Sequence, residues 1–269
     1  MSGRIPLLAA LLLLATLAVP SAPAGAAAPS KIAPGVQMIT AGAQCTGNFV
    51  FRDRRKRVYV GYAAHCAGKG ESTDTNGCKT PSLPMGTRVS FVTGMNGLSD
   101  GTTVGYGRLR YSSWAAMQRA GTSSTAICET NDFALVQVDR AYRSRVDPTF
   151  PSFGGPIAIG GVPAAGERVY TYGSSSLRGS SAKTGSVLES DARSATVFTP
   201  SPGIPGDSGS GYLDARGRAF GVLSTVNIAP AAGTNGVGGL AAQVSFARTH
   251  GLPKLRLVPG RAAFNGSSR

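Results

Sequence analysis

The stretch Gly206-Asp207-Ser208-Gly209-Ser210 gives the strongest functional signal in this chain. Each of its residue types favours turns, so by itself the stretch is compatible with an ordinary surface turn. Ser208 is also a candidate nucleophile, because Gly206 can adopt backbone angles that are closed to other residues. The N–H groups of Gly206 and Ser208 could then point the same way and form an oxyanion hole for a tetrahedral intermediate.

A serine hydroxyl needs a base within hydrogen-bond reach, and the base needs an orienting group. His65 is the candidate base, since it follows the apolar run 58–63 and its ordinary pKa suits proton transfer at neutral pH. The alternative, a core histidine held by a backbone bond, leaves the other two motifs unexplained. Asp132 is the candidate acid because it begins the apolar run 133–136, where a carboxylate must be paired. None of the rival acids starts an equally buried-looking run: Asp100, Asp139 and Asp147.

The stretches 63–66, 131–135 and 206–210 resemble the three signature regions of chymotrypsin-like serine proteases, in the family order His, Asp, Ser. The cysteine pattern and the 37 glycines are closer to secreted bacterial members of the actinobacterial kind. The resemblance covers roughly residues 37 to 250. It implies an all-β fold of two six-stranded antiparallel β-barrels with a short C-terminal helix. It also implies a serine endopeptidase that acts through His65, Asp132, Ser208 and an acyl-enzyme.

The same resemblance suggests further roles. Ser224 would support Asp132 with a hydrogen bond, and Asp207 would pair with a cation. The sequence has no Ile-Val-Gly-Gly start, so we do not expect a freed amino terminus to be that cation. Substrate would contact Pro202, six residues before the nucleophile, and the wall Ser224, Thr225 and Val226. Residues 197–205 contain no acidic side chain, so we expect small or medium apolar substrate side chains rather than Arg or Lys.

The sequence also predicts the organisation of the chain. The apolar run Leu7 to Val19 and the small residues 24–26 indicate a signal peptide over residues 1–26. The alternative, a permanent anchor, would need roughly 20 apolar residues. We expect an N-terminal barrel at 27–148, which carries His65 and Asp132, and a C-terminal barrel at 149–269, which carries Ser208 and ends in a helix and a loose tail. Short helices are expected at Trp114–Ala120 and Val244–Thr249, and His250 is interpreted as structural. The expected strands are 46–51, 58–63, 88–92, 103–110, 133–138, 168–172, 185–188, 195–199, 210–213 and 219–226.

Four cysteines in an exported chain predict two disulfides. Of the three possible connectivities we favour Cys45–Cys66, which would join neighbouring strands beside His65, and Cys78–Cys128. With two histidines and no Cys-x-x-Cys pair, the sequence indicates no metal site. The mechanism needs no cofactor.

The formal charge of +14 is interpreted as serving solubility; the alternative is that a basic surface holds the protein near anionic cell-wall polymers or acidic substrates. The basic run 52–57 is interpreted as a solvated hairpin turn, and nothing resembles a nucleic-acid motif. We expect a secreted extracellular monomer without stable membrane insertion. Its partners would be a protein or peptide substrate and, as a second candidate, a protein inhibitor.

Two other function classes compete with an endopeptidase. A protease-like binding protein could retain all three residues yet have an unformed oxyanion loop. An α/β-hydrolase esterase would need glycine at position 210, where this chain has Ser210, and the chain order Ser, Asp, His. The sequence therefore disfavours the esterase.

Overall fold

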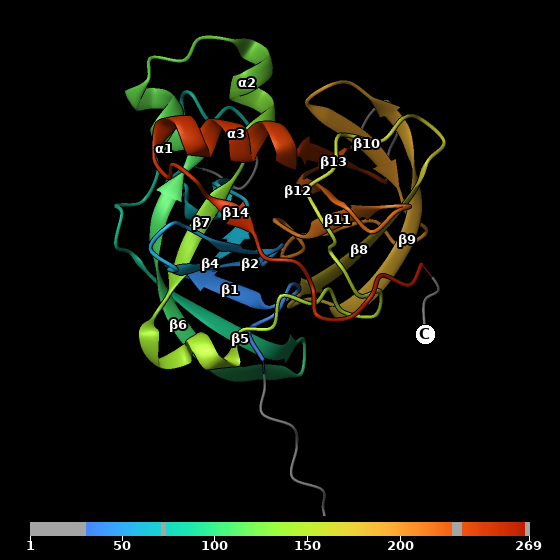
Figure 1. Cartoon of the computed structure of the whole chain (residues 1–269), viewed down its shortest axis with the longest axis horizontal. Coiled ribbons are helices and arrows are strands. Elements are labelled where there is room, and N and C mark those ends of the chain that lie inside the picture. Colours follow the sequence, from blue (N-terminus) through green and yellow to red (C-terminus); the bar gives the residue numbers. More distant parts are fainter. Residues whose placement is uncertain (1–30, 71–73, 228–232, 267–269) are drawn as a thin grey trace, which may run out of the picture.

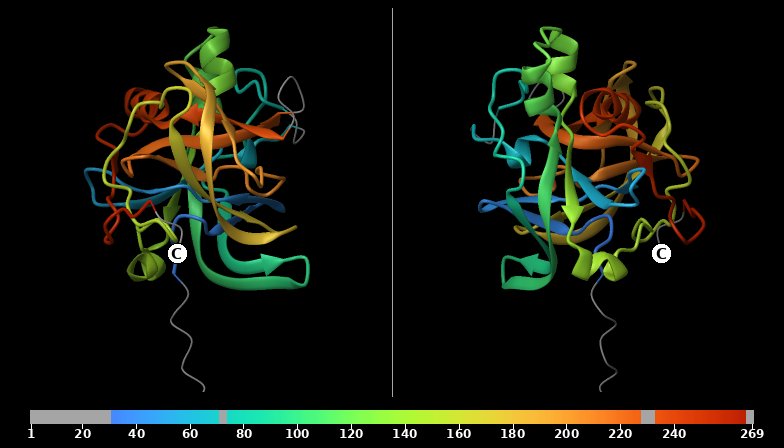
Figure 2. Two further views of the ribbon diagram at one scale, coloured as in Figure 1. Left: turned by 90° about the vertical axis from the view of Figure 1, so that its right-hand side faces the viewer. Right: turned by 60° about the vertical axis from the view of Figure 1, so that its left-hand side comes forward.

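The computed structural model describes residues 31–70, 74–227 and 233–266. The predicted signal peptide, residues 1–26, lies outside them. Two β-rich halves lie side by side, and a helix near the end of the chain lies over the first half with one end at the second (Figures 1 and 2).

The N-terminal half is an eight-stranded sheet in the order β14-β3-β4-β7-β6-β5-β1-β2, with antiparallel neighbours. Two more strands belong to it than the six expected, and one of the eight, β14, comes from the last part of the chain and lies beside β3. The bounds are β1 (Gln37–Thr40), β2 (Ala43–Thr46), β3 (Val50–Arg52), β4 (Val58–Tyr62), β5 (Arg88–Asn96), β6 (Ser99–Ser112), β7 (Ala134–Val138) and β14 (Arg256–Leu257). The expected hairpin around the basic run is confirmed as β3 and β4.

The C-terminal half is a closed barrel in the order β10-β13-β12-β11-β8-β9. Its six strands are β8 (Arg168–Ser175), β9 (Gly179–Ser190), β10 (Ser194–Phe198), β11 (Gly211–Asp214), β12 (Ala219–Asn227) and β13 (Thr234–Gly239). The predicted fold class, an all-β double-barrel architecture, is confirmed. The strand β13 was not expected, because four of its six residues are glycine or asparagine, which are uncommon in strands.

Both expected helices are present: the first is shifted by one residue towards the start of the chain, and the second begins four residues earlier and ends one residue later than expected. α1 (Ser113–Arg119) begins where the Ser112 hydroxyl accepts a hydrogen bond from the Ala115 N–H at 3.5 Å. α3 (Leu240–His250) packs against α1 and β12. His250 stacks on Phe246 with ring centroids 4.0 Å apart, as expected of a structural residue. The short α2 (Thr125–Thr130) and the 3₁₀ turns η1 (His65–Ala67) and η2 (Arg140–Arg145) were not foreseen.

A hydrophobic cluster joins the two halves. It contains Phe49 and Phe133 from the first half and Phe150 and Leu213 from the second, all buried. The rings of Phe49 and Phe150 lie 5.7 Å apart. A Cβ at Gly211 would sit 2.6 Å from the Phe49 ring, so the glycine allows this close approach. The shared core fixes the halves relative to each other, and residues from both can therefore form one site.

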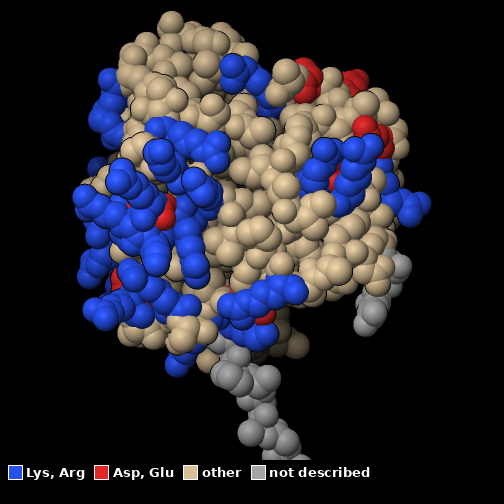
Figure 3. Space-filling model, in the orientation of Figure 1, with Lys and Arg blue, Asp and Glu red and all other residues tan. Residues whose placement is uncertain are grey.

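Lys and Arg side chains gather on the part of the surface where Figure 1 places β14 and β4 (Figure 3). In the β3–β4 turn, Asp53 accepts hydrogen bonds from the Arg57 N–H at 2.9 Å and from Arg57 Nε at 2.6 Å. This ion pair closes a solvated turn, as predicted. Within the described part of the chain, no helix has the length and apolar character needed to cross a bilayer.

Candidate active site

His65 and Asp132 meet because their strands are paired. Tyr62 at the end of β4 lies opposite Ala134 at the start of β7, so in this antiparallel pair both flanking segments leave the same edge. The His65 N–H donates to Asp132 Oδ1 at 2.8 Å, and His65 Nδ1 lies 2.6 Å from Asp132 Oδ2. Backbone and ring of the histidine are thus both fixed by one carboxylate.

Ser224 on β12 completes this group from the other half. Its hydroxyl donates to Asp132 Oδ2 at 2.6 Å, as the resemblance suggested. Asp132 is 2% exposed, and burial alone would raise the pKa of its carboxyl. The charge and hydrogen bonds of His65, together with Ser224, outweigh burial and lower that pKa. Burial likewise disfavours charge on His65, but Asp132 prevails and raises the pKa of the imidazole.

Ser208 lies in a turn that is pressed against the segment leading to His65. Its carbonyl oxygen accepts a hydrogen bond from the Thr46 N–H at 2.8 Å. Gly209 has φ of +88°, and a Cβ there would lie 2.8 Å from the Ala63 nitrogen. The Gly209 N–H donates to Leu223, next to Ser224, at 2.8 Å. The Ser208 turn therefore contacts the segments that carry His65 and Ser224.

The backbone of this turn leaves the expected N–H groups available. The N–H groups of Asp207, Gly209 and Ser210 donate to backbone carbonyls at 2.8–3.0 Å. Those of Gly206 and Ser208 have no such acceptor among the described residues. Gly206 adopts φ of +95°, a conformation that favours glycine. Two free donors flank Asp207, as an oxyanion hole requires.

Ser210 strengthens the same turn. Its hydroxyl donates to the Asp207 carbonyl at 2.6 Å, and its N–H donates to that oxygen at 3.0 Å. The side chain is buried, and no other acceptor is needed for the hydroxyl. Serine at this position therefore serves the turn where the resembling family more often has glycine.

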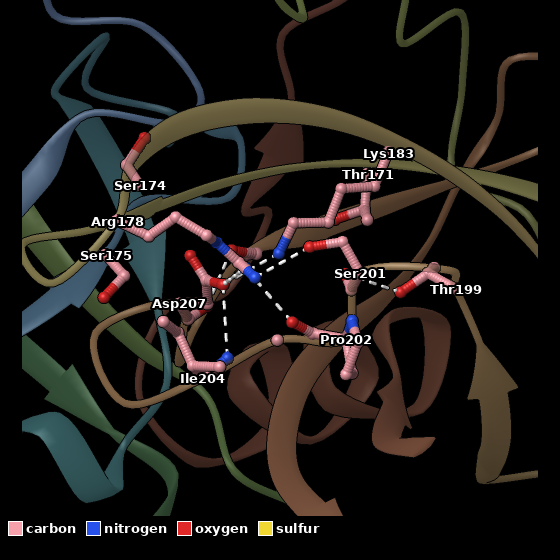
Figure 4. Close-up of polar contacts among 12 residues, drawn as sticks. Thr171, Ser174, Ser175, Arg178, Lys183, Thr199, Ser201, Pro202, Ile204 and Asp207 are labelled. Carbon is pink, nitrogen blue, oxygen red and sulfur yellow. Dashed lines mark hydrogen bonds and ion pairs between the residues drawn. The ribbon is translucent and has the colours of Figure 1, made fainter. Parts of the chain in front are cut away.

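The Asp207 carboxylate has two cationic partners (Figure 4). Lys183 Nζ lies 2.8 Å from Asp207 Oδ2, and Arg178 donates to the same oxygen at 2.9 Å. The Ile204 N–H donates to it at 3.2 Å. The sequence did not reveal these cations, because Lys183 stands in a run of small polar residues that carries no mark of burial.

Both predicted disulfides are present. Cys45–Cys66 joins β2 to η1 beside His65, and Cys78–Cys128 joins the loop before β5 to α2. Cys45, Cys66 and His65 lie close enough together to suggest a metal site. Their two sulfurs are bonded to each other, however, and cannot act as thiolate ligands.

Two residues of β2 that the sequence did not single out support the site. The Thr46 hydroxyl donates to the Gly206 carbonyl at 2.8 Å. Gln44 Nε2 donates to the same carbonyl at 3.0 Å, and Gln44 Oε1 accepts from the Ser176 N–H at 2.8 Å. The Gly206 carbonyl is thus held by two side chains of β2. A four-residue strand gives no period from which they could have been found.

The residues expected to contact substrate lie on two segments that Asn235 connects. The Gly203 N–H, next to Pro202, donates to Asn235 Oδ1 at 2.7 Å, and Asn235 Nδ2 donates to the Thr225 carbonyl at 3.3 Å. Val226 is 45% exposed, while Ser224 and Thr225 are partly buried. Asn235 is a further site residue that the sequence did not indicate.

The fold can be compared with known proteins. No family model and no curated protein sequence matches this chain. A solved Glu endopeptidase has a similar structure, with a TM-score of 0.53 and 19% identity over 80% of this chain and 89% of that chain. Thermobifida fusca Protease A gives a TM-score of 0.52 and 16% identity over 85% and 99%. A glutamic acid specific serine protease gives 0.50 and 16% over 84% and 100%.

These likenesses show that the chain has the chymotrypsin-like fold of bacterial serine proteases. At such identities they show the fold alone. Activity must be argued from the residues of this chain.

Proposed function

We propose that this chain is a secreted serine endopeptidase that uses His65, Asp132 and Ser208. The observation that supports it most is the hydrogen-bonded series Ser224, Asp132, His65, contributed by both halves, against which the Ser208 turn packs. A turn or a core histidine alone would not need this series. The structural neighbours named above are an endopeptidase, a protease and a serine protease.

In this proposal Asp132 sets the tautomer of His65. The imidazole Nδ1–H donates to the carboxylate, which leaves Nε2 free to accept a proton. Ser208 Oγ attacks the carbonyl carbon of the scissile peptide, a C–O bond forms, and the hydroxyl proton passes to Nε2. The negative oxygen is held by the N–H groups of Gly206 and Ser208.

The intermediate then collapses. The C–N bond breaks, the leaving amine takes the proton from His65, and an acyl group stays on Ser208. A water molecule repeats the sequence: His65 removes its proton, its oxygen attacks the acyl carbon, and Ser208 leaves with the proton returned. Only protein groups and water take part.

Several finer assignments belong to the same proposal. The expected preference for small or medium apolar side chains rests on Pro202 and the Ser224–Val226 wall, and a peptide library tests it. Secretion is supported by the signal-like start and by two disulfides, which persist in oxidising compartments. The domain boundary at 148/149 and the monomeric state remain predictions, as does binding of a protein inhibitor.

The decisive experiment compares the purified mature protein with its Ser208→Ala variant on unstructured casein. Both proteins should have the same circular dichroism spectrum, and an organophosphonate should label only the parent. We expect the parent to cleave casein and the variant to lose nearly all activity. A folded, disulfide-bonded parent that is inert and unlabelled would refute the proposal and favour the binding-protein function.

A further inference from the structure

A cavity of about 230 Å³ lies along one side of α3. Its walls come from three parts of the chain: α2 with the residue that follows it, the turn between β9 and β10, and α3 itself (Figure 1). None of His65, Asp132 and Ser208 lines it. The volume is smaller than that of sites for drug-sized molecules, so any ligand that fits must be small.

Two buried side chains that line this cavity have polar atoms without partners. Asn131 is 5% exposed and Gln243 is 2% exposed. Among the described residues, no group pairs with Asn131 Nδ2, Asn131 Oδ1 or Gln243 Oε1. These are three of the nine buried side-chain atoms that lack a partner in the part of the chain that the structure describes. Because buried polar atoms are nearly always paired, they indicate an occupant that the chain itself does not supply.

The two amides are held in place by their surroundings. The Asn131 N–H donates to the Ile127 carbonyl at 3.0 Å, and the Asn131 carbonyl accepts from the Ser113 hydroxyl at 2.5 Å. Gln243 Nε2 donates to the Thr130 carbonyl at 3.1 Å, which fixes the amide so that Oε1 is the free atom. The cavity therefore offers one donor group and two acceptor atoms. A peptide group, with its N–H and its carbonyl, is complementary to that set, whereas a simple ion is not.

The cavity also carries positive charge. Arg193 lines it, and no aspartate or glutamate does so among the described residues. Within the described chain the Arg193 guanidinium makes no hydrogen bond or ion pair. Asp191, the acid nearest to it in sequence, instead accepts the N–H groups of Arg193 and Ser194 at 2.7 Å each. A guanidinium in this state is complementary to a carboxylate, which it can bind through two parallel hydrogen bonds.

The remaining wall is apolar. Ile127 on α2 and Ala242 and Phe246 on α3 line the cavity. The Phe246 ring is held by His250, which stacks on it at 4.0 Å and whose Nδ1–H donates to the Phe246 carbonyl at 3.1 Å. An apolar side chain of moderate size can lose its contact with water against this wall.

We propose that this cavity binds the carboxyl-terminal residue of a short peptide. Arg193 binds the terminal carboxylate. The amides of Asn131 and Gln243 pair with the last peptide group, and Phe246 contacts an apolar side chain. This second binding site goes beyond the proposed endopeptidase function and does not rest on it. An endopeptidase with the expected apolar preference releases chain ends of this kind.

The first test titrates the isotope-labelled Ser208→Ala variant, so that no catalysis disturbs the measurement. The probe is N-acetyl-L-leucine, which has an amide, an apolar side chain and a free carboxylate. We expect saturable shifts of the side-chain amide signals of Asn131 and Gln243 in NMR spectra, while the His65 N–H signal stays unmoved. Without saturable shifts the unpartnered atoms face water alone, and shifts confined to the surroundings of His65 mean binding only at the active site. Either result would overturn the proposal.

The second test assigns the ligand groups to residues. N-acetyl-L-leucinamide lacks the carboxylate, and isocaproate lacks the amide. Arg193→Gln should raise the Kd of N-acetyl-L-leucine roughly tenfold, because charge-assisted hydrogen bonds are lost, and should leave the Kd of the leucinamide unchanged. Gln243→Leu should weaken binding of N-acetyl-L-leucine and leave the Kd of isocaproate unchanged.

The matched control is Arg216→Gln, which removes the same charge from the turn between β11 and β12, outside the cavity. It should bind N-acetyl-L-leucine as the parent does. Arg193 and Arg216 are both exposed, so neither replacement should disturb the fold, and circular dichroism checks this. Equal weakening in the two variants would mean that general charge attracts the ligand, and the proposal would be wrong. It would also be wrong if Arg193→Gln weakened the leucinamide as much as the acid.

Discussion

Thr46 donates its backbone N–H to the carbonyl oxygen of Ser208 at 2.8 Å, and its hydroxyl to the carbonyl of Gly206 at 2.8 Å. One residue of the first half thus holds both sides of the loop in the second half. It also follows Cys45, whose disulfide partner Cys66 is adjacent to His65. The proposed nucleophile and the proposed base are therefore both positioned from a single short strand.

Thr46→Val should weaken both catalysis and stability. The substitution keeps the shape of the side chain but removes the hydroxyl, so the Ser174 N–H loses a bond of 3.3 Å and the Gly206 carbonyl keeps only Gln44. An unsatisfied buried polar group costs about 1–3 kcal/mol. We expect the free energy of unfolding, measured in urea, to fall by an amount of that order, and we expect a lower kcat. Thr46→Ser retains the hydroxyl and should behave like the parent; equal kcat in all three would contradict the prediction.

Ser224→Ala should lower kcat/KM by roughly tenfold, since a hydrogen bond to a charged group contributes about 1.5–3 kcal/mol and water can partly replace it. Without the hydroxyl the pKa of Asp132 should rise, because one of its stabilising bonds is lost. Steady-state kinetics over a pH range will measure the fall in kcat/KM and any change in its pH dependence. Ser224→Thr keeps the hydroxyl and serves as control. If kcat/KM and its pH dependence are unchanged in Ser224→Ala, the hydrogen bond from Ser224 to Asp132 does not contribute to catalysis.

Activity should fall at acidic pH with a midpoint above 6.5, the ordinary imidazole value, because Asp132 raises the pKa of His65. The base must be neutral to accept the Ser208 proton, so protonation removes activity as pH decreases through the raised pKa. The pH dependence of kcat/KM checks this for the free enzyme. In Asp132→Asn the residual activity should show a lower midpoint. A parent midpoint below 6.5 would be inconsistent with the paired geometry.

Removal of each disulfide should give opposite rankings for stability and for activity. Cys78 and Cys128 are 50 residues apart, and Cys45 and Cys66 are 21 apart. Chain entropy then predicts that Cys78–Cys128 contributes roughly 4 kcal/mol to the free energy of unfolding and that Cys45–Cys66 contributes roughly 3 kcal/mol. We expect the Cys78→Ala/Cys128→Ala variant to unfold more easily, and the Cys45→Ala/Cys66→Ala variant to lose more kcat.

Chemical denaturation and casein cleavage below the unfolding transition measure the two effects. The activity ranking follows from position, because only Cys45–Cys66 joins the segments next to Thr46 and His65. If both double variants lose activity in proportion to their stability alone, the positioning role of Cys45–Cys66 is wrong.

The sequence predicted the parts of the site that lie in or beside strong patterns. His65, Asp132 and Ser224 flank or belong to apolar strands, and the bonds among them were foreseen. The supporting residues could not be predicted from the sequence, because their roles arise from contacts between distant segments. Gln44 and Thr46 lie on a strand too short to show a period, and Asn235 lies on the Gly-rich β13. Lys183 is buried against Asp207, a partner 24 residues away in sequence that no local pattern indicates.

The strand β14 lies beside β3 on the edge of the first half, with Arg256 opposite Arg52. An edge strand without a neighbour offers its hydrogen-bonding groups to other chains. Residues 256 and 257 lie far along the chain, so this edge stays open until synthesis has passed them. The half that holds His65 and Asp132 therefore receives its last strand after the half that holds Ser208 has received all of its strands. The half whose synthesis begins first is the one whose sheet is completed last.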